Sequence, residues 1–127
     1  MTIKGYKQLT WALGVLLLLS VLGGGSAMLH FAKQEMRVRL AEEQTRIFAS
    51  CRDEAIKSGV ENAIDNLQYE WRYYPSGTKQ EIGSRLDRVV ERARLSAARE
   101  IIAHLRVKTG KDYGDDPEAW LKAYGKD

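Results

Sequence analysis

The sequence predicts an all-α protein: an N-terminal transmembrane helix, a juxtamembrane helix, and a small helical hairpin closed by a short C-terminal capping helix. One observation is a run of 25 residues, 8–32, that contains no Lys, Arg, Asp or Glu. The other is that apolar side chains after this run recur at spacings of three and four, which is typical of amphipathic helices. With 127 residues in all, only one small domain can follow the apolar run.

The apolar run lies between Lys7 and Lys33. At about 1.5 Å per helical residue it reaches roughly 37 Å, enough to cross a hydrocarbon layer of about 30 Å. We therefore predict a cytoplasmic tail at 1–7 and a transmembrane signal anchor at 8–32. The alternative is a signal peptide cleaved near residue 27, within a run of small residues. We favour the anchor because apolar residues resume at 28–32.

A single-pass membrane protein is thus expected, with the lipid bilayer as one partner. A short amino-terminal tail favours placing the soluble domain on the non-cytoplasmic side. The formal charge of +3 comes mostly from Lys4 and Lys7, because residues 33–127 contain 18 basic and 17 acidic side chains. Such a near-neutral domain does not indicate a nucleic-acid partner.

Residues 33–57 contain no Pro or Gly and predict one juxtamembrane helix. We expect its apolar stripe to pack on the chain's own domain; the alternative is a short coiled coil between two chains. Cys51 is the single cysteine, so no intramolecular disulfide can form, and we expect a buried apolar side chain. A disulfide-linked dimer of an exported chain is the alternative for this thiol. The expected stripe consists of Met36, Leu40, Ile47, Phe48, Cys51, Ala55 and Ile56.

The region 58–127 is predicted to form the helical hairpin domain. Its first helix should begin near Gly59, since Ser58 and Glu61 have the spacing of a capping box, and should end before Pro75. A second capping-box pattern, Thr78 and Glu81, predicts the longest helix over 79–108. Its expected apolar face contains Ile82, Leu86, Val89, Val90, Ala93, Ala97, Ile101 and Leu105.

The tail after residue 108 is predicted to stop that helix at Gly110 and to form a short final helix. Asp116 is a natural N-cap, with Pro117 at the first helical position. Trp120 and Tyr124, one turn apart, should dock this helix on the core. Capping and turn formation explain the acidic residues of the tail better than a calcium loop does, because the spacing is not that of an EF-hand.

The segment 109–124 resembles a closing segment of HEAT-like helical-repeat proteins, with the pattern Thr-Gly-x-Asp-x-Gly-x-Asp-Pro-x-x-Trp. The likeness covers about sixteen residues and the preceding helix, and it implies a structural device that offers surfaces to partners. A solenoid needs about three or more repeats, so an isolated unit is the most that it implies. The residues that carry it are Thr109, Gly110, Asp112, Gly114, Asp116, Pro117 and Trp120.

No arrangement of residues typical of catalysis is present, and the two histidines, His30 and His104, are isolated in sequence. We therefore expect no enzyme, no cofactor, no metal site and no small-molecule substrate. The expected function is a membrane-anchored, non-enzymatic interaction module, such as a small subunit or scaffold of a membrane complex. The alternative is an exported structural or envelope protein that self-associates through residues 33–57. The candidate partner-binding residues are Tyr73, Tyr74, Arg85, Arg88 and Arg92.

Overall fold

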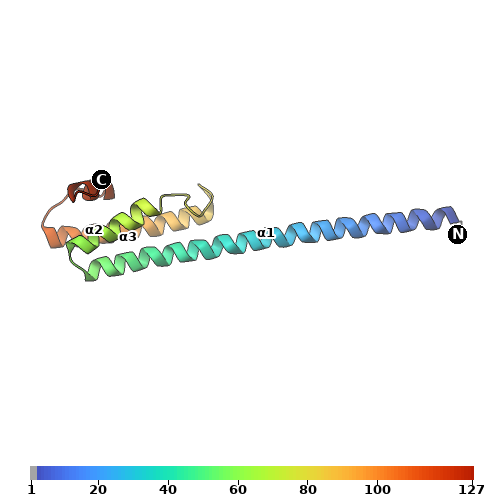
Figure 1. Ribbon diagram of the computed structural model, residues 1–127, viewed down its shortest axis with the longest axis horizontal. Helices are drawn as coiled ribbons and strands as arrows, with labels where there is room; N and C mark the ends of the chain where they lie inside the picture. Colours follow the sequence, from blue (N-terminus) through green and yellow to red (C-terminus); the bar gives the residue numbers. More distant parts are fainter. Residues whose placement is uncertain (1–2) are drawn as a thin grey trace. The chain divides into compact units, whose positions relative to one another are not determined.

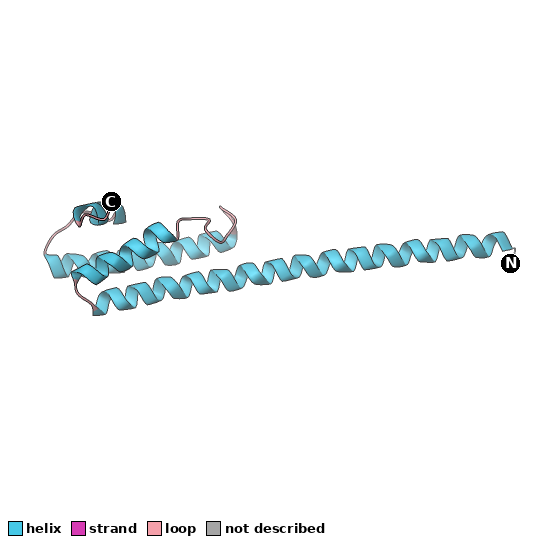
Figure 2. Ribbon diagram, in the orientation of Figure 1, coloured by secondary structure: helices cyan, strands magenta, loops and turns pink. Residues whose placement is uncertain are grey.

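The computed structural model describes residues 3–127 and consists of four helices joined by loops (Figures 1 and 2). The prediction of an all-α chain is confirmed: the described residues contain no strand. Residues 1–2 of the predicted tail 1–7 lie outside the described part. The chain divides into two compact units, residues 1–36 and residues 37–127. The helices are α1 (Ile3–Lys57), α2 (Val60–Tyr73), α3 (Arg85–Thr109) and α4 (Pro117–Ala123).

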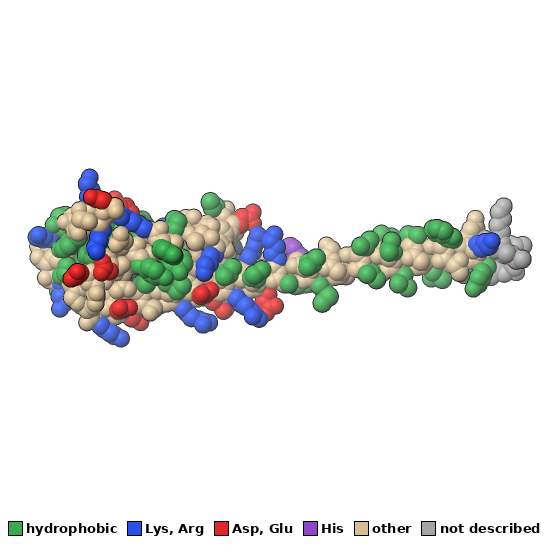
Figure 3. Space-filling view, in the orientation of Figure 1, with side chains coloured by type: hydrophobic (Ala, Val, Ile, Leu, Met, Phe, Trp, Pro, Cys, Tyr) green, Lys and Arg blue, Asp and Glu red, His purple; other side chains and the backbone are tan. Residues whose placement is uncertain are grey.

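The first unit is the apolar part of α1. The helix begins at Ile3 and continues through the whole predicted span 8–32, and every residue from 6 to 36 is exposed. The Ser20 hydroxyl donates to the Leu16 carbonyl, 2.9 Å away, so this polar group is satisfied within the helix. Figure 3 shows apolar side chains along this narrow part of the molecule. By length and composition, α1 is the one described helix able to span a membrane.

Residues 37–57 of α1 belong to the second unit and pack their apolar face into it. This confirms the expected packing on the chain's own domain, although the buried line is shifted from the predicted stripe. Phe48, Cys51 and Ala55 of the predicted stripe are buried, whereas Met36 and Ile56 are exposed. Ala41 and Gln44, which were not in the predicted stripe, are also buried.

The break between α1 and α2 occurs where it was expected, but the capping prediction is wrong. The Ser58 hydroxyl donates to the Ala55 carbonyl at 3.0 Å and therefore closes α1. Gly59 is the N-cap of α2, and no side chain caps it. At the other end, α2 stops at Tyr73, before Pro75, as the proline predicts.

Two apolar clusters form the core of the second unit. One lies where α2, α3 and α4 meet the end of α1, and Trp120 and Leu121 of α4 are fully buried in it. The other joins Phe48 of α1 to Tyr74 and Val90. The first cluster consists of Ala55, Ala63, Ile64, Leu67, Ala98, Ile101, Ile102, Leu105, Trp120 and Leu121.

The start of α3 differs from the prediction. The helix begins at Arg85 rather than Lys79, because the Ser84 hydroxyl caps it by accepting from the Asp87 N–H at 3.1 Å. Gly83, with a φ of 78°, turns the chain immediately before this cap. Ile82, predicted to lie on the buried helix face, is consequently in the loop and is 79% exposed.

The tail follows the predicted pattern. Gly110 ends α3 in the left-handed region, with a φ of 67°, and Asp116 caps α4 by accepting from the Glu118 N–H at 3.0 Å. The Trp120 ring N–H donates to the Gly114 carbonyl at 2.8 Å, which fixes the ring in the core. Asp112 accepts from the Gly114 N–H, so it has the turn-forming role that was expected.

Candidate interaction surface

A group of tyrosines lies at the C-terminal end of α2. Tyr69 and Tyr73 are one helical turn apart, so their side chains emerge on the same face. Their rings stack at 5.4 Å between centroids, with an angle of 18° between planes. Tyr73 is 70% exposed and Tyr69 is half-exposed. Exposed aromatic rings held against one another offer a rigid amphipathic surface, which is favoured at protein interfaces.

Tyr74, the second tyrosine singled out by the sequence, has a different position. It follows the last residue of α2 and turns inward, where it is buried and packs edge-on against Phe48 at 5.8 Å. Its hydroxyl lies 3.4 Å from that of Tyr69, and this contact raises the pKa of Tyr69 above its usual value. A binding role for Tyr74 would require its ring to be uncovered; in the structure the ring packs against those of Tyr69 and Tyr73.

A shallow hollow adjoins the exposed tyrosines. Both rings contribute to its wall, together with polar side chains from the preceding turns of α2. One of these, Arg72, is held by a two-point ion pair with Glu118 of α4, at 2.9 and 3.3 Å. The hollow is therefore lined by ordered side chains of mixed character. Its lining residues are Asp65, Gln68, Tyr69, Arg72 and Tyr73.

The three predicted arginines, Arg85, Arg88 and Arg92, lie along the first turns of α3 and are exposed. Arg88 donates to the Gly83 carbonyl at 2.6 Å. Because a carbonyl is neutral, this bond does not pair the charge of Arg88. In the part of the chain that the structure describes, no carboxylate lies within ion-pair distance of any of the three. No described hydrogen bond joins them to the tyrosines. The predicted residues thus lie on two elements, Tyr73 in α2 and the three arginines in α3, without a direct hydrogen bond between them.

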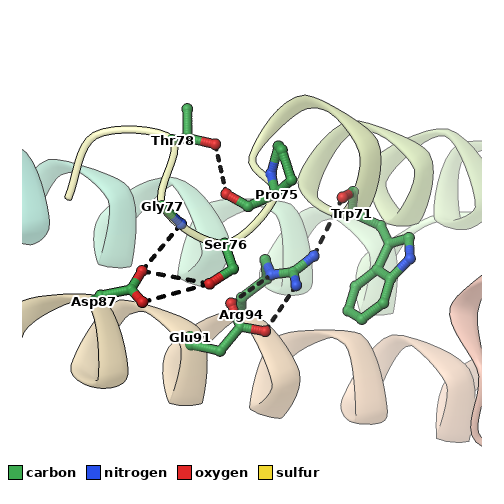
Figure 4. Close-up of polar contacts among 8 residues, drawn as sticks. All are labelled: Trp71, Pro75, Ser76, Gly77, Thr78, Asp87, Glu91 and Arg94. Atoms are coloured by element: carbon green, nitrogen blue, oxygen red, sulfur yellow. Dashed lines mark hydrogen bonds and ion pairs between the residues drawn. The ribbon is translucent and has the colours of Figure 1, made fainter. Parts of the chain in front are cut away.

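The loop between α2 and α3, residues 75–84, is built around the buried Asp87 carboxylate (Figure 4). Asp87 accepts from the Gly77 N–H at 3.0 Å and from the Gly83 N–H at 2.9 Å. The Ser76 hydroxyl lies at 3.5 Å from both carboxylate oxygens. One side chain therefore ties both ends of the loop to the first turn of α3. The loop has a defined conformation.

A second polar group lies deeper in the unit. Glu70 is fully buried, and neither of its carboxylate oxygens has a hydrogen-bond partner among the described residues. Burial raises the pKa of Glu70 to about 8, against a lowering effect of Arg94. Burial also raises the pKa of Cys51 to about 11, with Glu70 contributing to the rise. The thiol is thus protonated and unreactive at neutral pH, and its burial opposes the alternative of a disulfide-linked dimer.

Arg94 is a buried cation that could serve as a counterion to Glu70, but its hydrogen bonds go to other groups. Its guanidinium donates to Glu91 at 2.7 and 3.1 Å and to the Trp71 carbonyl at 3.2 Å (Figure 4). It also lies 4.0 Å from the centre of the Trp71 ring, within cation–π distance. This arrangement clamps α2 to α3. Glu70 is left as an isolated buried acid.

Sequence reasoning missed the buried polar residues, although one of them had a signal. Asp87 stands three positions after Ser84, which is a capping pattern as good as the Thr78 and Glu81 pattern that we chose. The flanking Gly83 favours the later start. Glu70 had no such signal, because its neighbours in the sequence do not show which face of α2 is covered.

Among the described residues, no group of three His, Cys, Asp or Glu side chains is placed to hold a metal ion. His104 is half-buried, with its Nε2 at 3.3 Å from the Ser58 carbonyl.

Together these features define a class: an all-α protein with one helix able to span a membrane and a compact helical unit that presents an aromatic surface. No family model, curated protein or solved structure matches the chain. Its function must therefore be argued from the site itself.

Proposed function

We propose that the chain is a single-pass membrane protein whose second unit is a non-enzymatic module that binds a protein partner in or near a membrane complex. The observation that carries this proposal is the exposed apolar run of α1. Residues 8–32 carry no charge, and every one of them is exposed. An apolar helix of this length is unfavourable in water, and a bilayer covers it while its backbone groups stay paired.

The short tail before this run favours a cytoplasmic amino terminus, with the second unit on the other side of the membrane. The HEAT-like closing segment fits the proposal as a device that completes a small stack of helices. Within the second unit, the surface of Tyr69 and Tyr73 and the hollow beside it support binding of a protein segment, since rigid aromatic rings are favoured anchors. Self-association through residues 33–57 is less favoured, because Phe48 and Ala55 are covered by the chain's own domain.

Alkaline washing of native membranes tests the anchor. We expect the full-length chain, verified by its intact mass, to stay with the membrane. Replacing Leu17 and Leu18 by Arg should release it, because each arginine at the centre of a span costs about 2.5–3.5 kcal/mol. The control is Val107→Arg, at an exposed position outside the run. Release of the unaltered chain, or a mass that begins near residue 28, would contradict the anchor.

Cross-linking in the same membranes tests the surface. Tyr73→Ala should weaken partner capture by about 2 kcal/mol, roughly thirtyfold in affinity, if the ring is an anchor. Val107→Ala removes an equally exposed apolar side chain and should have no effect. A third variant replaces Arg85, Arg88 and Arg92 by Ala. If capture survives both that change and Tyr73→Ala, the assignment of this surface is wrong.

A further inference from the structure

We propose that the loop of residues 75–84 contacts the bilayer, inserting Ile82 into the interfacial region of an anionic membrane. This inference rests on the proposed membrane anchor and adds a second point of attachment. It gives a role to the exposed Ile82 and a lipid-binding role to Arg85 and Arg88, which have no carboxylate partner among the described residues. The occupant of this surface is therefore the lipid headgroup layer.

Two contacts tie the loop to Arg37 of α1. Gln80 donates from its side-chain amide to the Arg37 carbonyl at 3.1 Å. Arg37 also forms an ion pair with Glu81 at 3.3 Å. Figure 1 shows the loop beside α1, at the end of the second unit where α3 begins. The residue before Ile82 is thus tied to α1 at Arg37.

Arg37 lies close to the apolar run in the sequence. Arg37 follows Ala32, the last residue of the run, by five positions. Five residues rise about 8 Å in a helix and reach roughly 18 Å even when fully extended. The headgroup layer extends about 5–8 Å beyond the hydrocarbon on each side. Because residues 32–37 are helical in α1, Arg37 lies at about the depth of the headgroup layer once the run is inserted, and the loop tied to Arg37 lies close to the membrane surface.

The loop presents an apolar side chain at its surface. Ile82 is 79% exposed although the loop around it is ordered by Asp87. Its side chain lies against Gly77, where a Cβ atom would collide with it. The Cγ1 and Cδ1 atoms of Ile82 are the ones near Gly77, and most of the side-chain surface remains uncovered. An ordered loop that displays an apolar tip suits insertion between headgroups.

Exposed positive charges follow the loop. Both acids near Ile82 are engaged: Glu81 of the loop pairs with Arg37, and Asp87 in the first turn of α3 accepts from backbone N–H groups. Arg85 and Arg88 follow the loop directly, are exposed, and have no carboxylate partner among the described residues. Unpaired cations next to an apolar tip favour the negative surface of a membrane that contains anionic lipid.

The test uses the full chain in vesicles of phosphatidylcholine with phosphatidylglycerol. Cys51→Ala removes the only native thiol, and Ile82→Cys then carries a single nitroxide. Collision rates with oxygen, which partitions into lipid, and with a water-soluble nickel chelate measure its depth. The matched control is Val107→Cys, which is 83% exposed near the other end of α3. We expect severalfold lower nickel accessibility at 82 than at 107, with higher oxygen accessibility.

A label at Leu18→Cys separates the two proposals. If position 18 is deep in the bilayer while 82 is as accessible to nickel as 107, the loop inference is overturned and the anchor stands. If position 18 is also aqueous, the anchor itself fails and the loop inference fails with it. Protection at 82 that disappears on diluting the protein in lipid would indicate a second copy over the loop and would overturn lipid contact.

Charge dependence provides the second measurement. Replacing Arg85 and Arg88 by Glu, or using vesicles of phosphatidylcholine alone, should raise nickel accessibility at 82 severalfold while leaving position 18 unchanged. The control is Arg99→Glu, which changes an exposed arginine in the middle of α3. Equal depth at 82 under all these conditions would overturn the role of the two arginines with anionic lipid.

Discussion

Glu70 shows how a single buried residue can make the stability of the second unit depend on pH. Its carboxyl group is fully buried without a hydrogen-bond partner, and its pKa rises to about 8 from the ordinary value of 4.5. Between these two values the folded chain holds a proton that the unfolded chain has lost. The free energy of unfolding therefore falls as pH rises through this interval, at up to about 1.4 kcal/mol per pH unit.

Glu70→Gln should remove this dependence, because the amide has a similar shape and does not ionise. We expect the unaltered chain to lose stability between about pH 5 and pH 8, and the variant to show a much flatter profile and higher stability at the alkaline end. Denaturant unfolding followed by circular dichroism across this range measures the difference. Glu118→Gln, at an exposed surface pair, is the control and should keep the slope. Equal slopes in all three proteins would contradict the buried-acid account.

Asp87 makes a complementary prediction, since it is a buried carboxylate whose partners are all present. Asp87→Ala would leave the N–H groups of Gly77 and Gly83 without their acceptor. We expect a loss of about 2 kcal/mol in the free energy of unfolding. Asp115→Ala removes an exposed carboxylate that pairs with Arg106, and should cost under about 0.5 kcal/mol. A difference too small to resolve between the two variants would mean that Asp87 does not organise the loop.

At the scale of elements, the loop between α2 and α3 depends on two glycines that have the same backbone conformation. Gly77 and Gly83 both have a φ of 78°, which side chains with a Cβ rarely adopt. They differ in surroundings: a Cβ at Gly77 would collide with Ile82, whereas a Cβ at Gly83 would meet no atom within 4 Å.

Alanine at each position therefore separates backbone strain from collision. Gly83→Ala should cost about 1–2 kcal/mol from strain alone. Gly77→Ala should cost about 1 kcal/mol more than Gly83→Ala, because the branched side chain of Ile82 must move to make room. Thermal or denaturant unfolding of both variants measures this. In the double variant Gly77→Ala with Ile82→Ala the extra cost should disappear; its persistence would show that the collision is not the cause.

The boundaries of the elements were predictable where a local rule had no competitor. Pro75 ended α2, Gly110 ended α3 and Asp116 capped α4, as their chemistry requires. The start of α3 was missed because two capping patterns competed. Thr78 uses its hydroxyl on the Pro75 carbonyl instead, and Ser84 forms the cap.

The buried polar residues and the inward turn of Tyr74 depended on tertiary packing. Tyr73 and Tyr74 are adjacent and chemically identical, so the sequence could not show that one is 70% exposed and the other buried against Phe48. The arginines were expected to be exposed and are. The exposure of Tyr73 and of the arginines could therefore be predicted, and the burial of Tyr74 could not.

At the scale of the whole molecule, the division into two compact units predicts that membrane attachment and domain stability are separate properties. Cys51 reports on the second unit, because its buried thiol reacts only when that unit opens. Replacing Leu17 and Leu18 by Arg should abolish membrane retention but leave the rate of thiol modification unchanged within about a factor of two, or under 0.5 kcal/mol. Ala63→Asp, in the core, should greatly accelerate the reaction.

The burial of Trp120 and Leu121 has a consequence for the order of events during synthesis. These side chains complete the core, yet they are translated nearly ninety residues after the end of the apolar run at Ala32. The apolar segment therefore leaves the ribosome while the domain behind it still lacks the side chains that close it. If this segment is the proposed anchor, a message that stops before residue 117 would yield a membrane-tethered chain with an open core.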